Sequence, residues 1–589
     1  MDVLRSARFL LSNKFSLIIP MVIIFLISSA LDLTGIALIG GYIGVIIDPS
    51  LLIQIQDKFL TFQYFDNFSP EEILLIFGYL LFFTFVIKFI FIIFTNFLIF
   101  KFANLEMAKI QKLMIRSFLD QEYEKFILGK NSDDLASISN YSGGYKEFLV
   151  NSLQFLSSML VIIAASILLA VISFDVVFWM LLIVGIILGF YNLYFSKKIN
   201  TFGQDFTDGA AELIQGTQEA ADGIKEIKTL GAEKVFVNTV SNAANKIAKG
   251  HIGLNIASIL PRHILEVILI GCIVLIISKD IFLNQDVSST LIILGTFAAA
   301  MVRITPLVSQ VQTSLNAIAY QSPSVLRLAE IIQEKGVNLD TDLNDLSQKS
   351  YEVSDNFIQD SFEQLKLENV SYTYPKSSKV SIQSTNIEIN KGDFVGIIGP
   401  SGAGKTTLID IILGFLKPTN GLLKFNNKDA HQDIKKLLML CAYLPQDIFL
   451  IHGTIKDNIT MQNSDISSEK IASAIKSSNL EGFLHDLPDG LDTHIGDKGV
   501  RLSGGQKQRV SIARALYFER EILIMDESTS ALDSTTEEIL IDELSKLREK
   551  KTIISIAHRI STLKECNKIY TVNNGQVEGP FTYREIAAK

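Results

Sequence analysis

Cysteine, tryptophan and histidine are scarce in this chain, which has 3 Cys, 1 Trp and 7 His among 589 residues. Cys272, Cys441 and Cys566 show neither metal-binding nor redox spacing, so we expect no disulfide framework and interpret all three as buried small hydrophobic residues. A basic surface interleaved with aromatic residues is also missing, and the net charge is −9. This composition argues against a nucleic-acid partner.

Long hydrophobic runs are concentrated before residue 330. The hydrophobic fraction is 48% and the mean hydropathy is +0.33, which is too apolar for a soluble chain. Six runs are long enough to cross about 30 Å of hydrocarbon as helices, at residues 15–47, 72–100, 148–173, 175–196, 256–279 and 289–310. Residues 1–329 are therefore predicted to form an α-helical membrane domain with six transmembrane helices.

Basic residues are distributed unevenly among the connections between these runs. Residues 101–147 and 196–251 are rich in lysine, whereas residues 48–71 and 280–288 contain Lys58 alone. The positive-inside rule puts the two lysine-rich connections in the cytoplasm. Their helix-like patterning predicts that the spans continue as long cytoplasmic helices.

The composition changes again after the last hydrophobic run. Residues 330–361 are polar, acidic and without clear periodicity, so we expect a linker. Residues 362–589 have the length of one α/β domain, with a strand-rich opening and a helical insert between about 454 and 500. The chain is thus predicted to join a membrane domain (1–329) through a linker (330–361) to an α/β domain (362–589).

A glycine-rich segment at residues 399–407 predicts a phosphate-binding P-loop. It follows a short apolar run at 393–398 that reads as a strand, and a helix-like run begins near Leu408. Small residues let backbone N–H groups approach a triphosphate, while Lys405 supplies positive charge and the Thr406 hydroxyl can hold Mg²⁺. The candidate nucleotide-binding residues are Gly399, Ser401, Gly402, Ala403, Gly404, Lys405, Thr406 and Thr407.

Two adjacent carboxylates follow a second apolar run at 522–525. Asp526, at the end of a buried strand, is a candidate Mg²⁺ ligand. Glu527 is a candidate catalytic residue that orients or deprotonates the attacking water.

The order of the motifs resembles that of ATP-binding cassette (ABC) transporters. After the P-loop come Leu-Ser-Gly-Gly-Gln at 502–506, the strand ending in Asp-Glu at 526–527, Ser-Ala-Leu-Asp at 530–533 and the isolated His558. The resemblance implies ATP and Mg²⁺ as cofactors and an ATPase coupled to transport. One departure is Asp497, which stands where exporters of this family usually have glutamate.

The resemblance also assigns roles to single residues. It implies that His558 contacts the γ-phosphate, that Gln446 touches Mg²⁺ and the attacking water, and that Tyr374 stacks on adenine, although Tyr372 lies two residues away. One membrane domain with one ATPase is half a transporter, so a homodimer is implied. The second half of each site then comes from the partner subunit's copy of Ser503, Gly504, Gly505 and Gln506.

Charged residues inside the hydrophobic runs are the clue to the substrate. Lys88, Arg262 and Arg303 each cost roughly 2.5 to 3.5 kcal/mol at a bilayer centre, so they must face water or a partner. One interpretation is that they bind an anionic substrate. The other is that Lys88 pairs with Asp32, and Arg262 with Glu266, as structural ion pairs.

Short features of the membrane domain look like those of bacterial lipid-linked oligosaccharide flippases: the acidic first span around Asp32, Pro261-Arg262, and Arg303 with Pro306. This likeness implies flipping of a polyprenyl-diphosphate-linked oligosaccharide, a membrane lipid-linked substrate, across the bacterial inner membrane, with the ATPase in the cytoplasm. An exporter of peptides, drugs or lipopolysaccharide precursor remains an alternative. A nucleotide-gated channel or regulator is another, disfavoured by the hydrolytic pair Glu527 and His558.

Overall fold

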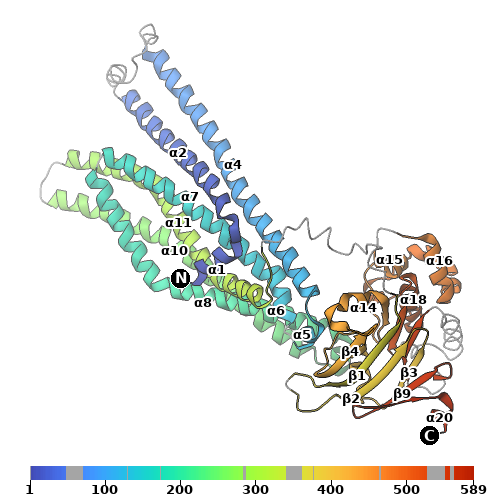
Figure 1. The fold of residues 1–589 in the computed structure, drawn as a ribbon. Coiled ribbons are helices and arrows are strands. Elements are labelled where there is room, and N and C mark those ends of the chain that lie inside the picture. Colours follow the sequence, from blue (N-terminus) through green and yellow to red (C-terminus); the bar gives the residue numbers. More distant parts are fainter. Residues whose placement is uncertain are drawn as a thin grey trace. The chain divides into compact units, whose positions relative to one another are not determined.

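The computed structural model describes residues 2–47, 70–128, 131–172, 174–282, 287–339, 361–375, 377–462, 466–526, 551–557 and 563–588. The chain divides into two compact units (Figure 1). The first, the helical unit, comprises Met1–Gln121 and Leu128–Lys349. The second, the sheet unit, comprises Glu122–Ile127 and Ser350–Lys589.

Six long helices form the helical unit: α2 (Ile18–Ile47), α4 (Pro70–Leu119), α7 (Ser142–Ile172), α8 (Phe174–Asp222), α10 (Glu233–Phe282) and α11 (Val287–Glu334). Each contains one of the six predicted spans, except that the first span begins in the 3-10 helix η1 (Ser12–Leu17). The shorter helices among the unit's described residues are α1 (Asp2–Leu11), α6 (Asn131–Ala136), the π-helical turn η2 (Ser137–Tyr141) and α9 (Ile224–Leu230).

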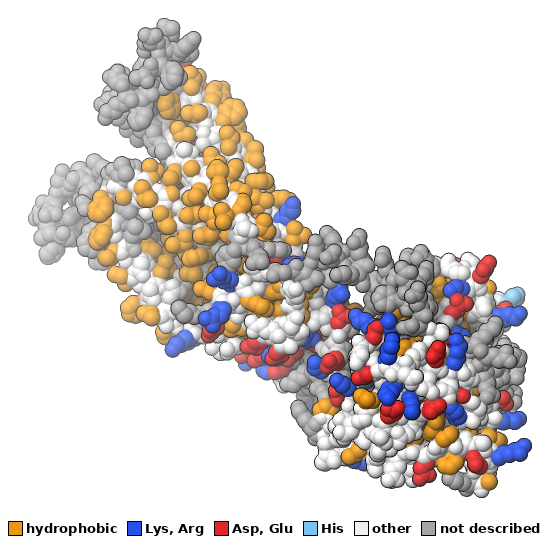
Figure 2. Space-filling view, viewed as in Figure 1, with side chains coloured by type: hydrophobic (Ala, Val, Ile, Leu, Met, Phe, Trp, Pro, Cys, Tyr) orange, Lys and Arg blue, Asp and Glu red, His pale blue; other side chains and the backbone are white. Residues whose placement is uncertain are grey.

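Hydrophobic side chains cover much of the face of the helical unit that Figure 2 shows. On α4, for example, Leu75, Phe83 and Phe89 are each about 60% exposed. By length and composition, three described stretches are able to cross a membrane: Ile18–Gly35, Leu74–Leu119 and Asp133–Leu168. An apolar surface of this extent is stable only against lipid or another apolar surface.

The long helices extend beyond the predicted spans, as the charge-rich patterning indicated. α4 continues to Leu119 and α8 to Asp222, while α10 begins at Glu233. α8 packs along α10, and Lys246 of α10 donates to both carboxylate oxygens of Glu212 at 2.6 and 2.8 Å. A Cβ at Gly203 would lie 2.0 Å from the Tyr320 carbonyl oxygen, so only glycine allows α8 and α11 to approach this closely.

The expected linker begins as helix. α11 continues through Glu334, and Ile331 and Ile332 are buried in the helical unit's core. Residues 340–360 lie outside the described residues.

The sheet unit is built on one sheet of ten described strands: β1 (Gln364–Tyr372), β2 (Ile382–Asn390), β3 (Phe394–Ile398), β4 (Asn420–Phe425), β5 (Lys428–Asp429), β6 (Cys441–Leu444), β7 (Ile522–Asp526), β8 (Thr552–Ile556), β9 (Lys568–Asn573) and β10 (Gln576–Phe581). Their order is β5-β4-β1-β2-β10-β9-β3-β8-β7-β6. β3 is parallel to both neighbours, β8 and β9, and β7 is parallel to β8 and β6. β1, β2 and β4 pair antiparallel.

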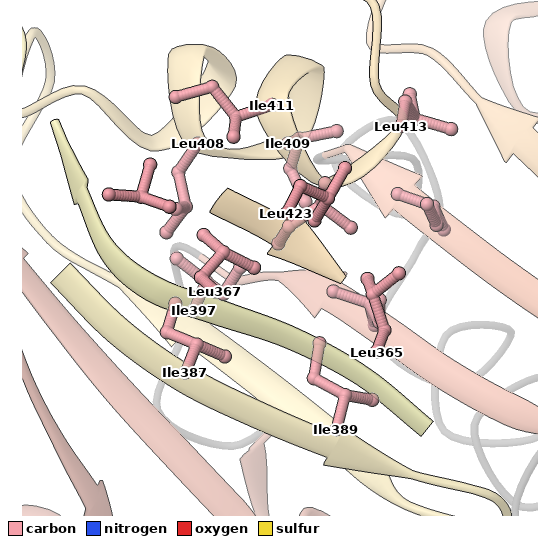
Figure 3. Close-up of a cluster of buried hydrophobic side chains, with 14 of the residues drawn as sticks. Leu365, Leu367, Ile387, Ile389, Ile397, Leu408, Ile409, Ile411, Leu413 and Leu423 are labelled. Carbon is pink, nitrogen blue, oxygen red and sulfur yellow. The ribbon is translucent and has the colours of Figure 1, made fainter. Parts of the chain in front are cut away.

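Alternating apolar residues of β1 and β2 form one wall of the sheet unit's core. Leu365 and Leu367 of β1 and Ile387 of β2 meet Leu408 and Ile411 of α13 (Lys405–Ile412) (Figure 3). This apolar cluster fixes α13, and therefore the loop that precedes it, against the sheet.

The other described helices of the sheet unit are α5 (Tyr123–Leu128), α14 (Ile434–Leu440), α15 (Ile455–Thr460), α16 (Ser468–Ser477), α17 (Glu481–His485), α18 (Gly504–Tyr517) and α20 (Tyr583–Ala587), with 3-10 turns η4 (Ala430–Gln432), η5 (Gly490–Asp492) and η6 (Asp497–Gly499). α15 to α17 occupy the range predicted as a helical insert, and α15 and α16 pack on α18. Cys566 is buried as expected and Cys441 is half-buried, while the side chain of Cys272 lies outside the described residues.

Candidate nucleotide-binding site

The segment between β3 and α13 has the geometry of a phosphate-binding loop. Gly402 and Gly404 have φ of +76° and +108°, values that L side chains rarely adopt. A Cβ on Gly399 would lie 2.1 Å from the Val572 carbonyl oxygen of β9. The glycine spacing therefore satisfies both the turn and the close approach of the loop to the sheet.

Lys405 begins α13 and is only 6% exposed. Its Nζ donates to the carbonyl oxygens of Gly399 at 2.9 Å and Pro400 at 3.2 Å, so the ammonium lies along the loop. The first N–H groups of a helix favour anions, and the ammonium adds a full charge beside them.

The loop also leaves room for a triphosphate. Ser401, Gly402 and Thr406 are exposed, and a Cβ built on Gly402 would meet no atom within 4 Å. Ala403 is buried, while the Gly575 N–H donates to its carbonyl at 3.0 Å and anchors the loop from beneath. The residues present thus fit ATP.

Asp526 stands at the same edge of the sheet as the loop. It ends β7, which runs parallel to β8, and β8 runs parallel to β3, so the carboxyl ends of these strands share one edge. Asp526 is 4% exposed, and the Tyr443 hydroxyl donates to its Oδ2 at 3.3 Å. A buried carboxylate at the sheet edge that also holds the loop with the exposed Thr406 hydroxyl offers the oxygen ligands that Mg²⁺ prefers.

Magnesium is held in such sites with few protein ligands, since Mg²⁺ retains waters and phosphate oxygens. The described ranges contain no group of three His, Cys, Asp or Glu able to hold a metal ion. Gln446, the third predicted Mg²⁺ ligand, is exposed in the segment between β6 and α15. Glu527 and His558 lie outside the described residues, so their roles stay predictions.

The structure separates the two candidate adenine-stacking tyrosines. Tyr374 is half-buried, and its hydroxyl lies 3.3 Å from Thr407 Oγ1 on α13. Tyr372 is 1% exposed, and its hydroxyl donates to Glu124 Oε1 at 2.7 Å. Only Tyr374 therefore lies beside the phosphate-loop helix with part of its ring accessible; stacking on adenine stays a prediction.

Ser503 caps the N-terminus of α18. The Gln506 N–H donates to Ser503 Oγ at 3.3 Å, and the Ser503 N–H donates to Gln506 Oε1 at 2.8 Å, which completes a capping box. Ser503 and Gly504 are exposed, and Gly505 is half-buried. The predicted motif is thus an accessible helix N-terminus, a position that favours anions.

Asp410 is a buried acid that sequence reasoning missed. It is 7% exposed on α13, where burial, followed by the charge of Asp526, raises its pKa to about 6. The signal was available: Asp410 is the one acidic residue within the apolar helix that follows the P-loop. Because the charge of Asp526 affects the pKa of Asp410, the two carboxyl groups interact electrostatically. α13 is therefore coupled to the candidate Mg²⁺ ligand Asp526.

The short helix α5 packs against residues of the sheet unit. The Tyr123 ring lies 5.0 Å from that of Phe415, and Glu124 accepts the Tyr372 hydroxyl. Residues 122–127 accordingly group with the sheet unit and not with the long helices on either side.

The cations predicted for substrate binding contact carboxylates. Lys88 of α4 forms an ion pair with Asp32 of α2, each about one-fifth exposed. Arg262 Nε donates to Glu266 Oε1 at 3.0 Å, one turn along α10, and its side chain is 60% exposed. These are the pairs of the ion-pair interpretation; Arg303 lies in α11, and its side chain is outside the described residues.

Two family models match most of the chain. The model described as the ABC transporter matches residues 382–530, and the model described as the ABC transporter transmembrane region matches residues 17–304. The first match contains the loop, Asp526 and α18. The second contains five of the six long helices and the start of the sixth.

The chain is similar to curated proteins of this kind. It is 28% identical to ABC transporter B family member 1 of Dictyostelium discoideum over 82% of this chain and 52% of the relative. It is 42% identical to a putative export ATP-binding/permease protein of Rickettsia typhi over 36% of this chain and 37% of the relative. The matches thus span about half or less of these relatives' lengths.

A further relative is the heterocyst differentiation ATP-binding protein HepA of a Nostoc species, 30% identical over 66% of this chain and 62% of the relative. Among solved structures, that of a bacterial Atm1-family ABC exporter with ATP bound superposes with a TM-score of 0.75, covering 98% of this chain and 97% of that chain. At 18% identity, this likeness shows a shared fold.

Proposed function

The chain belongs to the ABC transporters, and we propose that it is an exporter half that hydrolyses ATP to drive transport across a membrane. The observation that carries this proposal is the shared sheet edge of the phosphate loop and Asp526. A buried lysine on the loop after β3 and a buried carboxylate at the end of β7, with β8 between the two strands, supply opposite charges at the sheet edge where a Mg²⁺-triphosphate needs both.

In the proposed reaction each residue has a separate task. The loop N–H groups and Lys405 neutralise the phosphates, and Thr406 with Asp526 holds the magnesium ion, which when bound offsets charge on the transferring phosphoryl group. Glu527 orients or deprotonates the attacking water, and His558 holds the γ-phosphate end. Tyr374 stacks on the base, and Gln446 responds to the nucleotide state.

The proposed active assembly is a homodimer. The accessible start of α18 offers Ser503 and its neighbouring N–H groups to a phosphate held by the partner subunit's loop. ATP binds the closed pair of ATPase domains better than the open pair, so binding shifts the population toward closure and hydrolysis reverses it. Helix α5, which contacts Phe415 and Tyr372, would carry this motion to the long helices.

For the substrate, we propose a polyprenyl-diphosphate-linked oligosaccharide moved across a bacterial inner membrane, with the ATPase domains in the cytoplasm. The support is the likeness of the membrane motifs to flippases, together with the exposed guanidinium of Arg262. A diphosphate is the anion that such a cation can recognise, and the lipid tail can remain in the bilayer.

A general exporter is the second candidate, and the ion pairs favour it. A lysine already paired with Asp32 has less charge to offer an anionic substrate. Compounds such as peptides or drugs would then be recognised without the three cations.

The test is ATP hydrolysis by the full chain reconstituted in proteoliposomes, with Lys405→Ala as the control for background. We expect the wild-type chain to hydrolyse ATP and the Lys405→Ala chain to show no hydrolysis above background. Stimulation by polyprenyl-diphosphate-linked glycans, with no response to peptides, drugs or lipopolysaccharide precursor, would support the flippase. The reverse pattern would support the general exporter, and turnover unaffected by Lys405→Ala would overturn the ATPase proposal.

A further inference from the structure

Pro261 interrupts the hydrogen bonding of α10 at one carbonyl. In a regular helix the Ala257 carbonyl accepts from the N–H of the residue four positions later. That residue is Pro261, which lies inside α10 and has no N–H. The Ala257 oxygen is therefore left without its helical donor at a position where the residue is only 1% exposed.

Two side chains from other helices supply the missing donors. The Tyr191 hydroxyl of α8 donates to Ala257 O at 2.5 Å, and Asn316 Nδ2 of α11 donates to it at 3.1 Å. Asn316 Nδ2 also lies 3.1 Å from the Tyr191 hydroxyl. Tyr191 and Asn316 are themselves 5% and 2% exposed, so the whole arrangement is buried among three helices.

The two donors differ in what they connect. Tyr191 joins α8 to α10, which already pack along each other. Asn316 joins that pair to α11. Because a carbonyl has two lone pairs, loss of Asn316 leaves the oxygen satisfied by Tyr191. Separation of α11 at this point therefore strands no buried carbonyl.

A second acceptor for the asparagine lies one helical turn away on α11. Gln312 Nε2 donates to Asn316 Oδ1 at 2.9 Å and to Asn192 Oδ1 at 3.1 Å. Gln312 Oε1 is buried and has no hydrogen-bond partner within the part of the chain that the structure describes. An Asn316 amide released from Ala257 can turn to this oxygen, so both of its positions are satisfied.

We propose that the Ala257 carbonyl, freed by Pro261, is a reversible latch between α11 and the α8–α10 pair. Tyr191 holds the carbonyl permanently, and Asn316 engages and releases it as the helices rearrange. Engagement opposes the rearrangement, so the latch limits how often the transporter cycles. The effect on cycling rests on the proposed ATP-driven transport, whereas the latch itself does not.

The first measurement is thermal unfolding of the full chain in nanodiscs. Asn316→Ala and Tyr191→Phe each leave one donor, and we expect a small decrease in Tm. The double variant leaves the carbonyl unpaired, and we expect a further decrease of about 2–5 °C. Adding Pro261→Ala restores the helical N–H and should recover that further decrease. A double variant that Pro261→Ala does not rescue would contradict the role of the proline.

The second measurement separates a latch from a purely structural bond. Asn316→Ala should raise basal ATP turnover about threefold, the size expected for one interhelical hydrogen bond, with KM for ATP unchanged. Pro261→Ala in the Asn316→Ala chain should leave turnover high, because it repairs the carbonyl but not the link to α11. Turnover of Asn316→Ala that is unchanged, lower, or restored by Pro261→Ala would overturn the latch.

Two control variants keep this interpretation specific. Asn192→Ala removes the other partner of Gln312 without touching the carbonyl, and Thr313→Val removes a hydroxyl that donates to Ser309 O within α11 itself. Both should turn over ATP at the wild-type rate. If the wild-type chain shows no turnover at all, the proposed function fails, while the unfolding measurement still decides whether Pro261, Tyr191 and Asn316 act together.

Discussion

The sheet unit and the helical unit use polar side chains in different ways. In the sheet unit, Ser401, Thr406 and Ser503 stand exposed at a turn or a helix start, where loops hold them for a ligand. In the helical unit, Lys88 pairs with Asp32, and Asn316 binds a carbonyl that a proline has freed. These polar groups of the sheet unit are accessible to a ligand, whereas those of the helical unit are paired with other groups of the same unit.

The solvent explains this difference. A polar group at a loop in water loses little before its ligand arrives, whereas an unpaired polar group in an apolar bundle costs several kcal/mol. Polar residues of a span therefore bind one another first. A charge in a span consequently indicates an ion pair before it indicates a substrate, and a glycine-rich loop indicates its ligand directly.

In the sheet unit, we expect the largest effect from substitution of Glu527. Glu527→Gln should reduce ATP turnover by about 10² to 10⁴, because the general base or water-positioning group is lost. ATP binding should persist, since Lys405, Thr406 and Asp526 remain. Turnover and nucleotide affinity of the purified chain measure both effects, and wild-type turnover would remove Glu527 from the site.

A second experiment tests whether Ser503 at the N-terminus of α18 contributes to an ATP site on the partner subunit. Lys405→Ala and Ser503→Arg chains should each be inactive alone. Mixed, they should form heterodimers with one site made of two intact halves, so that part of the turnover returns. Activity that stays absent in verified heterodimers would contradict a site shared between subunits.

Of the two predicted substrate-binding cations whose side chains are described, Arg262 is the more accessible, with 60% of its side chain exposed against 19% for Lys88. Arg262→Ala should lower flipping of a polyprenyl-diphosphate-linked glycan at least about tenfold, since one close charge pair is worth up to about 4 kcal/mol at an effective dielectric of 20. Basal ATP hydrolysis should stay near wild type. Flipping at the wild-type rate by Arg262→Ala and Arg303→Ala chains would favour the general exporter.

Lys88 sharpens the same comparison, because its partner is known. Lys88→Gln leaves Asp32 unpaired between α2 and α4, so we expect a loss of stability and flipping. If Asp32→Asn in the same chain restores flipping, Lys88 is a structural partner, as the ion pair indicates. If flipping stays low while the melting temperature recovers, Lys88 contacts the substrate.

The smallest expected effect concerns a paired charge in the sheet unit. Burial alone would raise the pKa of Asp393, but hydrogen bonds from Lys568, the Asn390 N–H and Asn567 lower it. A lowered pKa contributes stability above the unfolded value, and this stability is lost as the pH falls through the folded value.

Lys568 Nζ lies 2.8 Å from Asp393 Oδ2, so Lys568→Gln should raise that pKa and shift the onset of acid unfolding to higher pH. The change in stability at neutral pH should be about 1–3 kcal/mol. Lys391→Gln is the matched control, because Lys391 contacts Glu521 at 3.7 Å near the surface. Equal acid midpoints for both variants would show that the Lys568 contact contributes nothing.

Much of this fold could be predicted from local sequence. The run before the P-loop is β3, the run ending at Asp526 is β7, and each of the six hydrophobic runs lies mostly in one long helix. These elements can be predicted from the sequence because apolar periodicity and glycine spacing involve only residues that are close in the chain. The linker was expected to start at residue 330, but α11 continues to Glu334, and Ile331 and Ile332 are buried in the core of the helical unit.

The choices that sequence left open were decided by contacts between distant residues. Tyr372 and Tyr374 are equivalent in sequence, and only the fold gives the first to Glu124 and the second to Thr407. Likewise, Pro261 is visible in the sequence, but its donors come from residues 66 and 59 positions from Ala257. Asp410 acquires its raised pKa because the fold buries it and because β7 brings Asp526 near it.

The sequence by itself determined the family, the nucleotide loop and the run of six apolar helices, because each depends on the spacing of neighbouring residues. Only the tertiary structure decided which tyrosine lies beside the loop, which intramembrane charges are paired and how the Ala257 carbonyl is satisfied. Those outcomes depend on which helices and strands meet, and a polar group buried by that meeting takes whichever partner lies within about 3 Å.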